Sequence, residues 1–162
     1  ASVEPFVIDP HSGEWTAANA YEWRPDARRF ELWECSVAGR LGLGVAVDHA
    51  LDVGVPAIEA RVAELARRLR HGLRALPGVT VHDKGRRQCG IVTFSLAGHD
   101  AATLSGRLRS EDRINTSVSL AASTRWDADE RHLPPMVRAS MHAFNTEAEV
   151  DLLLDAVPAP AR

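Results

Sequence analysis

The stretch from Val137 to Asp151 constrains the fold of this chain more than any other. Its first half alternates small or apolar residues with polar or aromatic ones, which is the pattern of a strand with one buried face. The residues expected on the other face are Arg138, Ser140, His142 and Phe144. Thr146 and Glu149 then have the spacing of a capping box, which predicts a helix start. The stretch therefore predicts a strand that presents a guanidinium, a hydroxyl and an imidazole, followed at once by a helix.

Hydrophobic periodicity predicts the elements that precede this stretch. The predicted helices cover residues 36–53, 56–76, 100–111 and 146–157, and the predicted strands cover 79–82, 90–96, 114–120 and 137–144. The polar faces of the second helix, which include Arg70, are expected to be solvated, and residues 121–135 are expected to form a polar loop. This order of elements predicts an α/β sandwich, with a sheet of about four strands and helices packed on one face.

Composition excludes several classes of protein. The net charge is −3 and no basic run occurs, so no nucleic-acid partner is expected. No apolar run reaches the about 18 residues of a membrane span, and the histidines show no metal-ligand spacing, so neither a membrane nor a metal site is expected. The thiols of Cys35 and Cys89 lie far apart in the sequence and are expected to be reduced, buried and structural. A cytoplasmic location is expected from these features.

Two segments resemble one enzyme family. Arg-x-Ser-x-His-x-Phe-Asn-Thr-x-x-Glu-Val-Asp, over residues 138–151, is similar to the C-terminal signature of class V, fold-type I pyridoxal-phosphate enzymes. Residues 29–39, Arg-Phe-Glu-Leu-Trp-Glu-Cys-Ser-Val-Ala-Gly, resemble the entry of that family into its small C-terminal domain. The resemblance implies that residues 29–157 form this small domain. Residues 1–28, in which scattered aromatic residues indicate no self-contained element, would be the tail of a large cofactor-binding domain, and residues 158–162 a disordered tail.

The resemblance also implies a site for an amino-acid substrate. Arg138 would bind the α-carboxylate, since a planar guanidinium can hold a carboxylate through two hydrogen bonds. Ser140 and His142 would line the same site. From its strand position alone, the favoured explanation of Arg138 would be a surface or intra-domain ion pair, for example with Glu147 or Glu149. An alternative from another class is a free-standing α/β ligand-binding or regulatory domain that holds an anion through Arg138.

Pyridoxal 5′-phosphate is the cofactor that the resemblance implies, and it requires a Schiff-base lysine. The chain has eighteen arginines but a single lysine, Lys84, in the turn-like segment 82–87. Lys84 is expected to be solvated, so no catalytic residue is expected in this chain, which would be an inactive C-terminal fragment of a protein more than twice as long. The family implies a homodimer in the full-length form, in which Glu34 and Ser36 would contact the cofactor of the other subunit.

Two features bear on the branch of the family. Trp33 and Glu34 replace the Gly-Thr pair of cysteine desulfurases, a form more similar to the ergothioneine-pathway C–S lyase and isopenicillin-N-epimerase-like branch. A desulfurase also needs a mobile cysteine in the loop before the signature arginine, and Leu120–Arg125 contains no thiol. The sequence therefore predicts transamination, C–S cleavage or epimerisation without persulfide chemistry.

Overall fold

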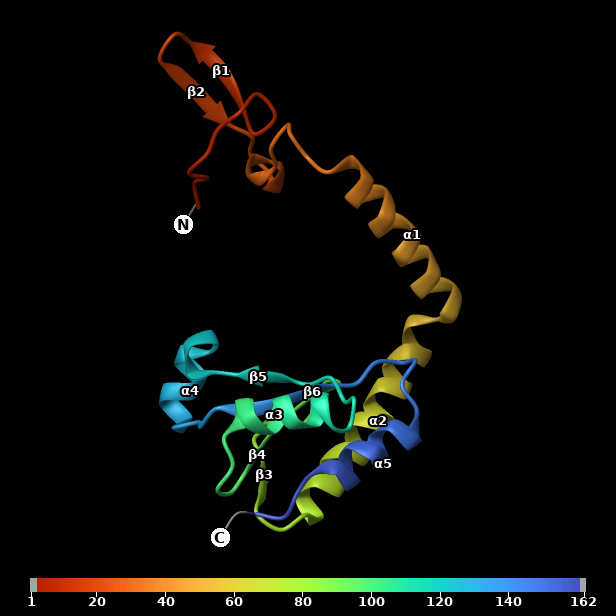
Figure 1. Cartoon of the computed structure of the whole chain (residues 1–162). Helices are drawn as coiled ribbons and strands as arrows, with labels where there is room; N and C mark the ends of the chain where they lie inside the picture. The colour runs from red at the N-terminus through yellow and green to blue at the C-terminus, as the bar shows by residue number, and fades with distance from the viewer. Residues whose placement is uncertain (1–2, 161–162) are drawn as a thin grey trace. The chain divides into compact units, whose positions relative to one another are not determined.

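The computed structural model describes residues 3–160, and these fall into two compact units (Figure 1). The N-terminal unit ends at His49 and the C-terminal unit begins at Ala50. The predicted boundary at residue 28 stays a prediction. Residues 158–160 have no regular secondary structure, and residues 1, 2, 161 and 162 of the two predicted tails lie outside the described residues.

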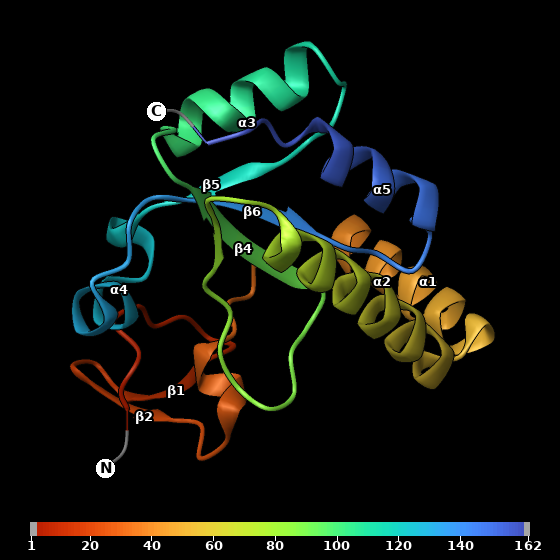
Figure 2. The same cartoon turned by 90° about the horizontal axis from the view of Figure 1, so that it is seen from below.

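The C-terminal unit is built on a four-stranded antiparallel sheet with the strand order β3-β4-β6-β5. The strands are β3 (Val79–Val81), β4 (Ile91–Leu96), β5 (Ser117–Ser119) and β6 (Met136–Ser140). The helices are α2 (Val55–Ala75), α3 (Ala101–Ser110), α4 (Arg125–Arg131) and α5 (Glu147–Ala156), with a short 3-10 helix, η2 (Ala121–Ser123). Figure 2 shows α2, α3 and α5 beside the sheet. The predicted α/β sandwich is therefore confirmed.

The core is formed by the apolar stripes of the helices and by the apolar side chains on one face of the sheet. The buried residues of the sheet come from alternate positions of β4 and β6, and the buried residues of the helices come from their apolar stripes. The core residues include Leu65, Leu69, Leu73, Val92, Phe94, Leu104, Leu108, Val137, Ala139, Val150 and Leu153. The capping box that opens α5 is present as predicted, with Thr146 and Glu149 each accepting the other's backbone N–H. The alternation in β6 therefore directs its remaining side chains away from the core.

A buried ion pair fixes the loop between β3 and β4 to helix α2. Arg70 is 4% exposed, and its Nε donates to Asp83 Oδ2 at 2.7 Å. Its Nη2 donates to the carbonyl oxygens of Cys89 and Ile91, both at 2.7 Å. The prediction that Arg70 is solvated is wrong, because these acceptors compensate for the loss of water around the guanidinium.

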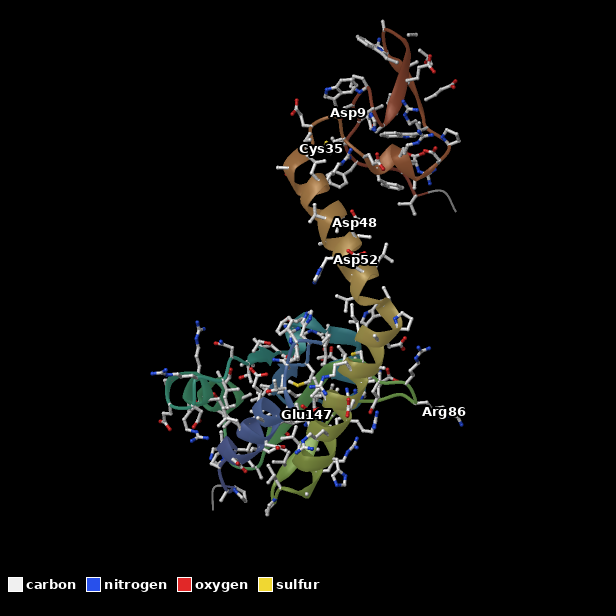
Figure 3. The ribbon with its side chains drawn as sticks, turned by 90° about the vertical axis from the view of Figure 1, so that its right-hand side faces the viewer. Asp9, Cys35, Asp48, Asp52, Arg86 and Glu147 are labelled. Atoms are coloured by element: carbon white, nitrogen blue, oxygen red, sulfur yellow. The ribbon has the colours of Figure 1, made fainter. Side chains whose placement is uncertain are left out.

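The N-terminal unit contains a β-hairpin, a 3-10 helix and most of a long helix. The hairpin pairs β1 (Gly13–Ala17) with β2 (Ala20–Trp23), so residues 1–28 do contain an element that the sequence did not predict. The 3-10 helix is η1 (Ala27–Phe30), and the long helix is α1 (Val37–Val53), close to its predicted bounds. Helix α1 buries none of its residues in this structure; Asp48 and Asp52 lie one turn apart on it (Figure 3).

The helices of the part of the chain that the structure describes were compared with the length and composition of a membrane span. No single helix there has both the length and the apolar composition needed to cross a bilayer. Helices α1 and α2 meet that composition only when they are taken together across the break at Gly54.

Candidate functional site

The sheet face that turns away from the core is mostly polar. Its polar side chains at alternate strand positions are half-buried or exposed: Thr80, Thr93, Ser95, Ser117, Ser119, Arg138 and Ser140. The apolar residues on the same face are the exposed Ile91 and the buried Met136. Arg138 lies on β6, between Thr93 of β4 and Ser117 of β5 in the pairing register. The sheet thus places one guanidinium among hydroxyl groups, with Arg138 and Ser140 on the face that the sequence predicts.

Arg138 makes one side-chain hydrogen bond, from its Nε to Ser117 Oγ at 3.0 Å. Among the residues that the structure describes, no carboxylate lies within ion-pair distance of Arg138. Neither of the acids considered from the sequence pairs with it. Glu147 binds Arg61, whose Nη2 donates to Glu147 Oε2 at 3.0 Å, and Glu149 accepts the Thr146 N–H at 2.7 Å. The alternative of an ion pair between Arg138 and Glu147 or Glu149 is therefore wrong.

The Arg61–Glu147 pair joins the start of α5, where Figure 3 labels Glu147, to helix α2. The hydrogen bond from Arg61 lowers the pKa of the Glu147 carboxyl to about 2. A second pair of the same kind joins Arg68 of α2 to Asp151 of α5, with Nε–Oδ1 at 2.9 Å. These pairs hold the helix that follows the signature strand, and they leave Arg138 unpaired.

His142 lies beyond the end of the strand, because β6 ends at Ser140 and not at residue 144. The backbone turns here, with His142 N–H donating to Asn145 Oδ1 at 2.8 Å and Asn145 N–H donating to His142 O at 3.0 Å. The imidazole stacks on Phe144 with ring centroids 4.7 Å apart and an angle of 12° between the rings. Both side chains are exposed, so the alternation of exposure continues although the predicted strand does not.

Lys84 is exposed, as predicted, and its ammonium pairs with the Asp127 carboxylate. The hydrogen bond from Lys84 lowers the pKa of Asp127, and Arg131 Nη1 donates to the same carboxylate at 2.9 Å. Arg131 also donates to the backbone carbonyl of His82 at 2.5 Å. An exposed ammonium held by a carboxylate does not fit the amine of a Schiff-base site. These contacts instead fasten α4, within the predicted loop 121–135, to the β3–β4 loop.

Glu34 and Ser36 belong to the N-terminal unit. Both residues are exposed, and Ser36 Oγ accepts the Gly39 N–H at 3.0 Å at the start of α1. Ser36 thus has a local capping role in the described structure. The thiols of Cys35 and Cys89 are free and exposed, so the prediction that they are buried is wrong.

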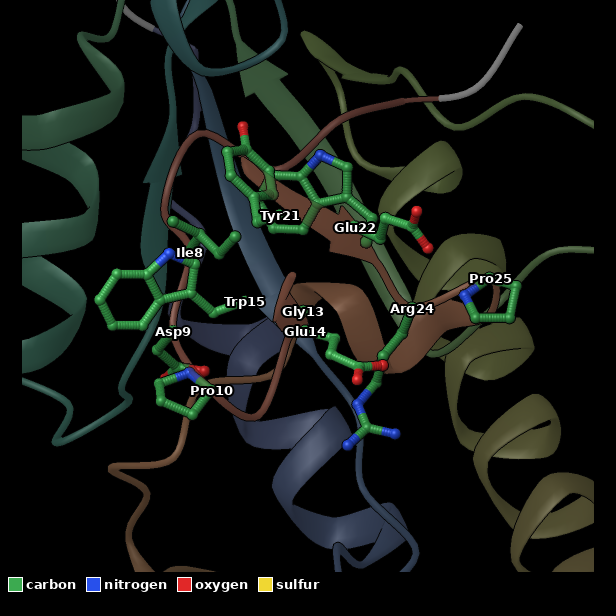
Figure 4. Close-up of a pocket in the computed structure, with 11 residues that line it drawn as sticks. Ile8, Asp9, Pro10, Gly13, Glu14, Trp15, Tyr21, Glu22, Arg24 and Pro25 are labelled. Carbon is green, nitrogen blue, oxygen red and sulfur yellow. The ribbon is translucent and has the colours of Figure 1, made fainter. Parts of the chain in front are cut away.

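A hollow of about 800 Å³ lies in the N-terminal unit, along the β1–β2 hairpin (Figure 4). Trp15 and Tyr21 are register partners and line it with Glu14, Glu22 and Arg24. This hollow was not predicted from the sequence. Trp15 is 79% exposed, so the hairpin presents aromatic surface of the kind that usually packs on a neighbouring surface.

Ser117, which accepts from Arg138, and Thr93, its register neighbour on the other side, were not predicted from the sequence as neighbours of Arg138. The alternation of the predicted strand 114–120 did assign Ser117 to its polar side, which was the available signal. The pairing of β5 and of β4 with β6, which brings both hydroxyls next to Arg138, cannot be read from either strand alone. Among the described residues, no group of three or more His, Cys, Asp or Glu side chains is arranged to hold a metal ion.

The fold is thus an antiparallel α/β domain, with Arg138 on the open face of β6, one of its two inner strands. The family model described as Aminotransferase class-V matches residues 3–153, and the chain belongs to this family. Pyridoxal 5′-phosphate is the cofactor that this membership and the chain's relatives support.

Curated relatives are named as cysteine desulfurases. The protein from Dickeya dadantii (strain 3937) is 30% identical over 127 residues, which are 78% of this chain and 30% of the relative. A probable cysteine desulfurase from Halalkalibacterium halodurans is 30% identical over 134 residues, 81% of this chain and 32% of that protein. The chain thus spans about a third of the length of these relatives. Their names favour the desulfurase branch over the branch expected from Trp33 and Glu34.

Solved structures share the fold. The apo cysteine desulfurase from Thermococcus onnurineus NA1 superposes with a TM-score of 0.79 at 23% identity, covering 94% of this chain and 38% of that chain. The cystine C–S lyase C-DES, in complex with its reaction product cysteine persulfide, gives a TM-score of 0.72 at 23% identity and covers 96% of this chain and 39% of its own.

Proposed function

We propose that this chain is part of a pyridoxal-phosphate-dependent enzyme that acts on an amino acid, and that Arg138 holds the α-carboxylate of the substrate. The observation that carries the proposal is the free guanidinium on the central strand, exposed and without a carboxylate partner among the described residues. A charged group that keeps its donors available on an open polar face suits an anionic ligand. Membership of the class V family supports the same reading.

The chemistry of the residues in this chain indicates which roles they can take and which roles belong to other parts of the enzyme. Pyridoxal phosphate, when bound, supplies the electron sink for reaction at the amino-acid carbon. Lys84 does not fit the Schiff-base role, so we assign that lysine and the catalytic groups to other parts of the enzyme. Arg138 binds and orients the substrate, while Ser140 and the stacked His142 line the approach to it. Glu34 and Ser36 remain candidate cofactor contacts across a homodimer, and a cytoplasmic location stays a prediction.

We infer that the reaction cleaves a carbon–sulfur bond of the substrate without passing sulfur to a cysteine in the loop before Arg138. The names of the relatives support sulfur amino-acid chemistry, since they include cysteine desulfurases and a cystine C–S lyase. Residues 120–135 contain no cysteine. The names of the curated relatives favour the desulfurase branch, whereas this absence and the Trp33-Glu34 pair are the sequence features behind the proposal of a lyase reaction.

Replacing Arg138 by Ala in the enzyme that carries this chain tests the clamp. Truncating one member of a desolvated charge pair costs about 2–5 kcal/mol, so kcat/KM should fall by roughly 30- to 4,000-fold. Arg138→Lys should recover part of this loss, because an ammonium keeps the charge without the planar fork. The measurement is steady-state kinetics with the amino-acid substrate and with an analogue whose α-carboxylate is a neutral amide.

The amide analogue is the discriminating control. Wild-type enzyme should reject the amide strongly, and Arg138→Ala should reject it little. If Arg138→Ala instead keeps the wild-type preference for the carboxylate, Arg138 is not the clamp and the assignment of the site is wrong, whatever the change in turnover.

The exposed thiols give a second test, directed at the type of reaction. In the proposed enzyme, Cys35→Ser and Cys89→Ser, alone or together, should leave turnover within about twofold of wild type, since neither thiol carries sulfur. The thiols themselves should react rapidly with a thiol reagent in the folded protein, as their exposure requires. Loss of activity in either variant, with the fold intact by circular dichroism, would assign persulfide chemistry to that cysteine.

A further inference from the structure

Two hydroxyl residues flank Arg138 across the sheet. Thr93 of β4 lies opposite it on one side, and Ser117 of β5 lies opposite it on the other. Both side chains are half-buried on the polar face of the sheet. Either of them could, by position, orient the guanidinium.

Thr93 is engaged elsewhere. Its hydroxyl donates to Asp83 Oδ1 at 2.7 Å, and its backbone N–H donates to the same oxygen at 2.8 Å. Asp83 is in turn held by the buried Arg70, at 2.7 Å from Nε to Oδ2. This network turns the Thr93 hydroxyl toward the β3–β4 loop and also satisfies the Asp83 carboxylate, which therefore does not pair with Arg138. Ser117 is left as the residue that contacts Arg138.

The contact with Ser117 selects one edge of the guanidinium. Arg138 Nε donates to Ser117 Oγ at 3.0 Å, so the edge formed by Nε and one Nη already has a partner. The edge formed by Nη1 and Nη2 keeps both of its donors in the described structure, and parallel hydrogen bonds from two nitrogens match the two oxygens of a carboxylate.

We propose that Ser117 is a positioning residue, which holds Arg138 so that the substrate carboxylate is received end-on by Nη1 and Nη2. This inference rests on the proposed function, in which Arg138 binds that carboxylate. An arginine side chain has several rotatable bonds, and fixing it before the substrate arrives removes part of the entropic cost of binding. A hydroxyl suits this task, because it accepts from Nε without adding a negative charge that would compete with the substrate.

Ser119 provides a matched control. It lies on β5 two residues from Ser117, it is also half-buried on the polar face, and its register partner is Met136. Its side chain makes no hydrogen bond within residues 3–160. Replacing Ser119 by Ala therefore changes the same strand, on the same face, without touching Arg138.

The experiment compares Ser117→Ala, Ser117→Thr and Ser119→Ala in the enzyme that carries this chain. Ser117→Ala should raise the KM for the amino-acid substrate by about 3- to 30-fold and leave kcat within about twofold, as expected for loss of one hydrogen bond that orients a charged group. Ser117→Thr keeps the hydroxyl and suits a strand, so its KM should stay close to wild type. Ser119→Ala should also behave as wild type.

A readout independent of turnover is the exchange of the Arg138 Nε–H with water, followed by ¹⁵N-edited NMR of the chain itself. Exchange should be slow in wild type and in Ser119→Ala, and faster in Ser117→Ala, because the hydrogen bond to Oγ protects this proton. Arg138→Lys removes the signal and so assigns it.

The outcomes separate the two proposals. If Ser117→Ala matches Ser119→Ala in KM and in Nε–H exchange, or if Ser117→Thr is as impaired as Ser117→Ala, Ser117 does not position the guanidinium and this inference is overturned. That result leaves the proposed function standing as long as Arg138→Ala loses discrimination against the amide analogue. If Arg138→Ala keeps the discrimination, the proposed function fails first and the role of Ser117 fails with it.

Discussion

Arginine residues in the C-terminal unit differ in the partners that the fold gives them. Arg61 and Arg68 of α2 hold the acids of α5, and Arg70 holds Asp83 inside the unit. Arg138 lies on a sheet face that offers hydroxyl groups instead of carboxylates. The difference arises because Glu147 and Asp151, one turn apart on α5, lie on the side facing α2, where pairing satisfies both charges. A guanidinium without such a partner keeps its donors available for a ligand.

The Arg61–Glu147 pair predicts a pH dependence of stability. The pKa of Glu147 is lowered to about 2 in the folded protein, below the ordinary value of 4.5, so between these values the unfolded state binds more protons. The stability that the pair contributes is therefore present above about pH 4.5 and is lost as the pH falls toward 2. Urea unfolding of wild type and Glu147→Gln from pH 2 to pH 7 measures it.

Wild type should be more stable than Glu147→Gln at neutral pH, and the difference should shrink through that window. Glu64→Gln is a useful control, since its carboxylate lies 3.3 Å from the same Arg61 but makes a more exposed and longer contact. A difference between wild type and Glu147→Gln that stays constant down to pH 2 would contradict the pairing. High salt should reduce the effect, because the pair is partly open to solvent.

At the scale of elements, the pairing of β4 with β6 depends on a close backbone approach at Gly90. Met141 N–H donates to Gly90 O at 2.8 Å, and a Cβ at residue 90 would meet Met141 O at 2.7 Å and Val62 at 2.5 Å. The backbone oxygen cannot move without disturbing the end of the signature strand. The glycine thus allows α2 and β6 to lie close to the start of β4.

Gly90→Ala should therefore destabilise the protein by about 1–3 kcal/mol, the usual cost of overpacking. Gly106→Ala is the matched control, because Gly106 lies within α3 and nothing is within 4 Å of the position of its Cβ. That change should stabilise the protein by up to about 1 kcal/mol through helix propensity. Chemical denaturation measures the free energy of unfolding of both variants. Changes in stability of equal size and the same sign would show that the backbone approach at Gly90 is not tight.

Periodicity predicted the elements whose side chains build the core. The stripe of Leu65, Leu69 and Leu73 and the alternation of β6 are confirmed, because burial imposes both patterns directly on the sequence. The β1–β2 hairpin was missed, since a register irregularity between Trp15 and Ala17 interrupts its alternation. A hydrophobic pattern predicts a helix or a strand only where one face of that element is consistently buried.

Tertiary partners explain the other differences. Helix α4 lacks an apolar stripe and depends on contacts such as those of Arg131 with Asp127 and with the His82 carbonyl. Arg70 lies among other polar residues of α2, and its partner Asp83 is in a loop, so the sequence pattern of the helix does not distinguish it from a solvated arginine. Arg138 was predicted as a site residue from its motif, while the contact with Ser117 required the sheet register.

At the scale of the whole molecule, the single lysine of the chain can be tested directly for a Schiff base with the cofactor. Lys84 is paired with Asp127, so mixing this chain with pyridoxal phosphate and then reducing with borohydride should give no stoichiometric adduct at Lys84. Peptide mapping by mass spectrometry measures the adduct, and Lys84→Arg reports the labelling of other amines. A stoichiometric adduct in wild type that disappears in Lys84→Arg would assign the Schiff base to Lys84. It would overturn the proposal that the Schiff-base lysine lies in another part of the enzyme.

The strand order also has a consequence for biosynthesis. Strand β5 pairs with β6, and β6 is synthesised after the other three strands of this sheet although it lies inside the sheet. The β3–β4 hairpin can form as soon as its residues leave the ribosome, whereas β5 then has no strand to pair with until Met136–Ser140 emerge. Until then, the edge of β4 that will pair with β6 and both edges of β5 are open to other chains. The strand that carries Arg138 therefore closes the sheet during synthesis, and a ribosome that stalls before residue 136 would leave these edges open to aggregation.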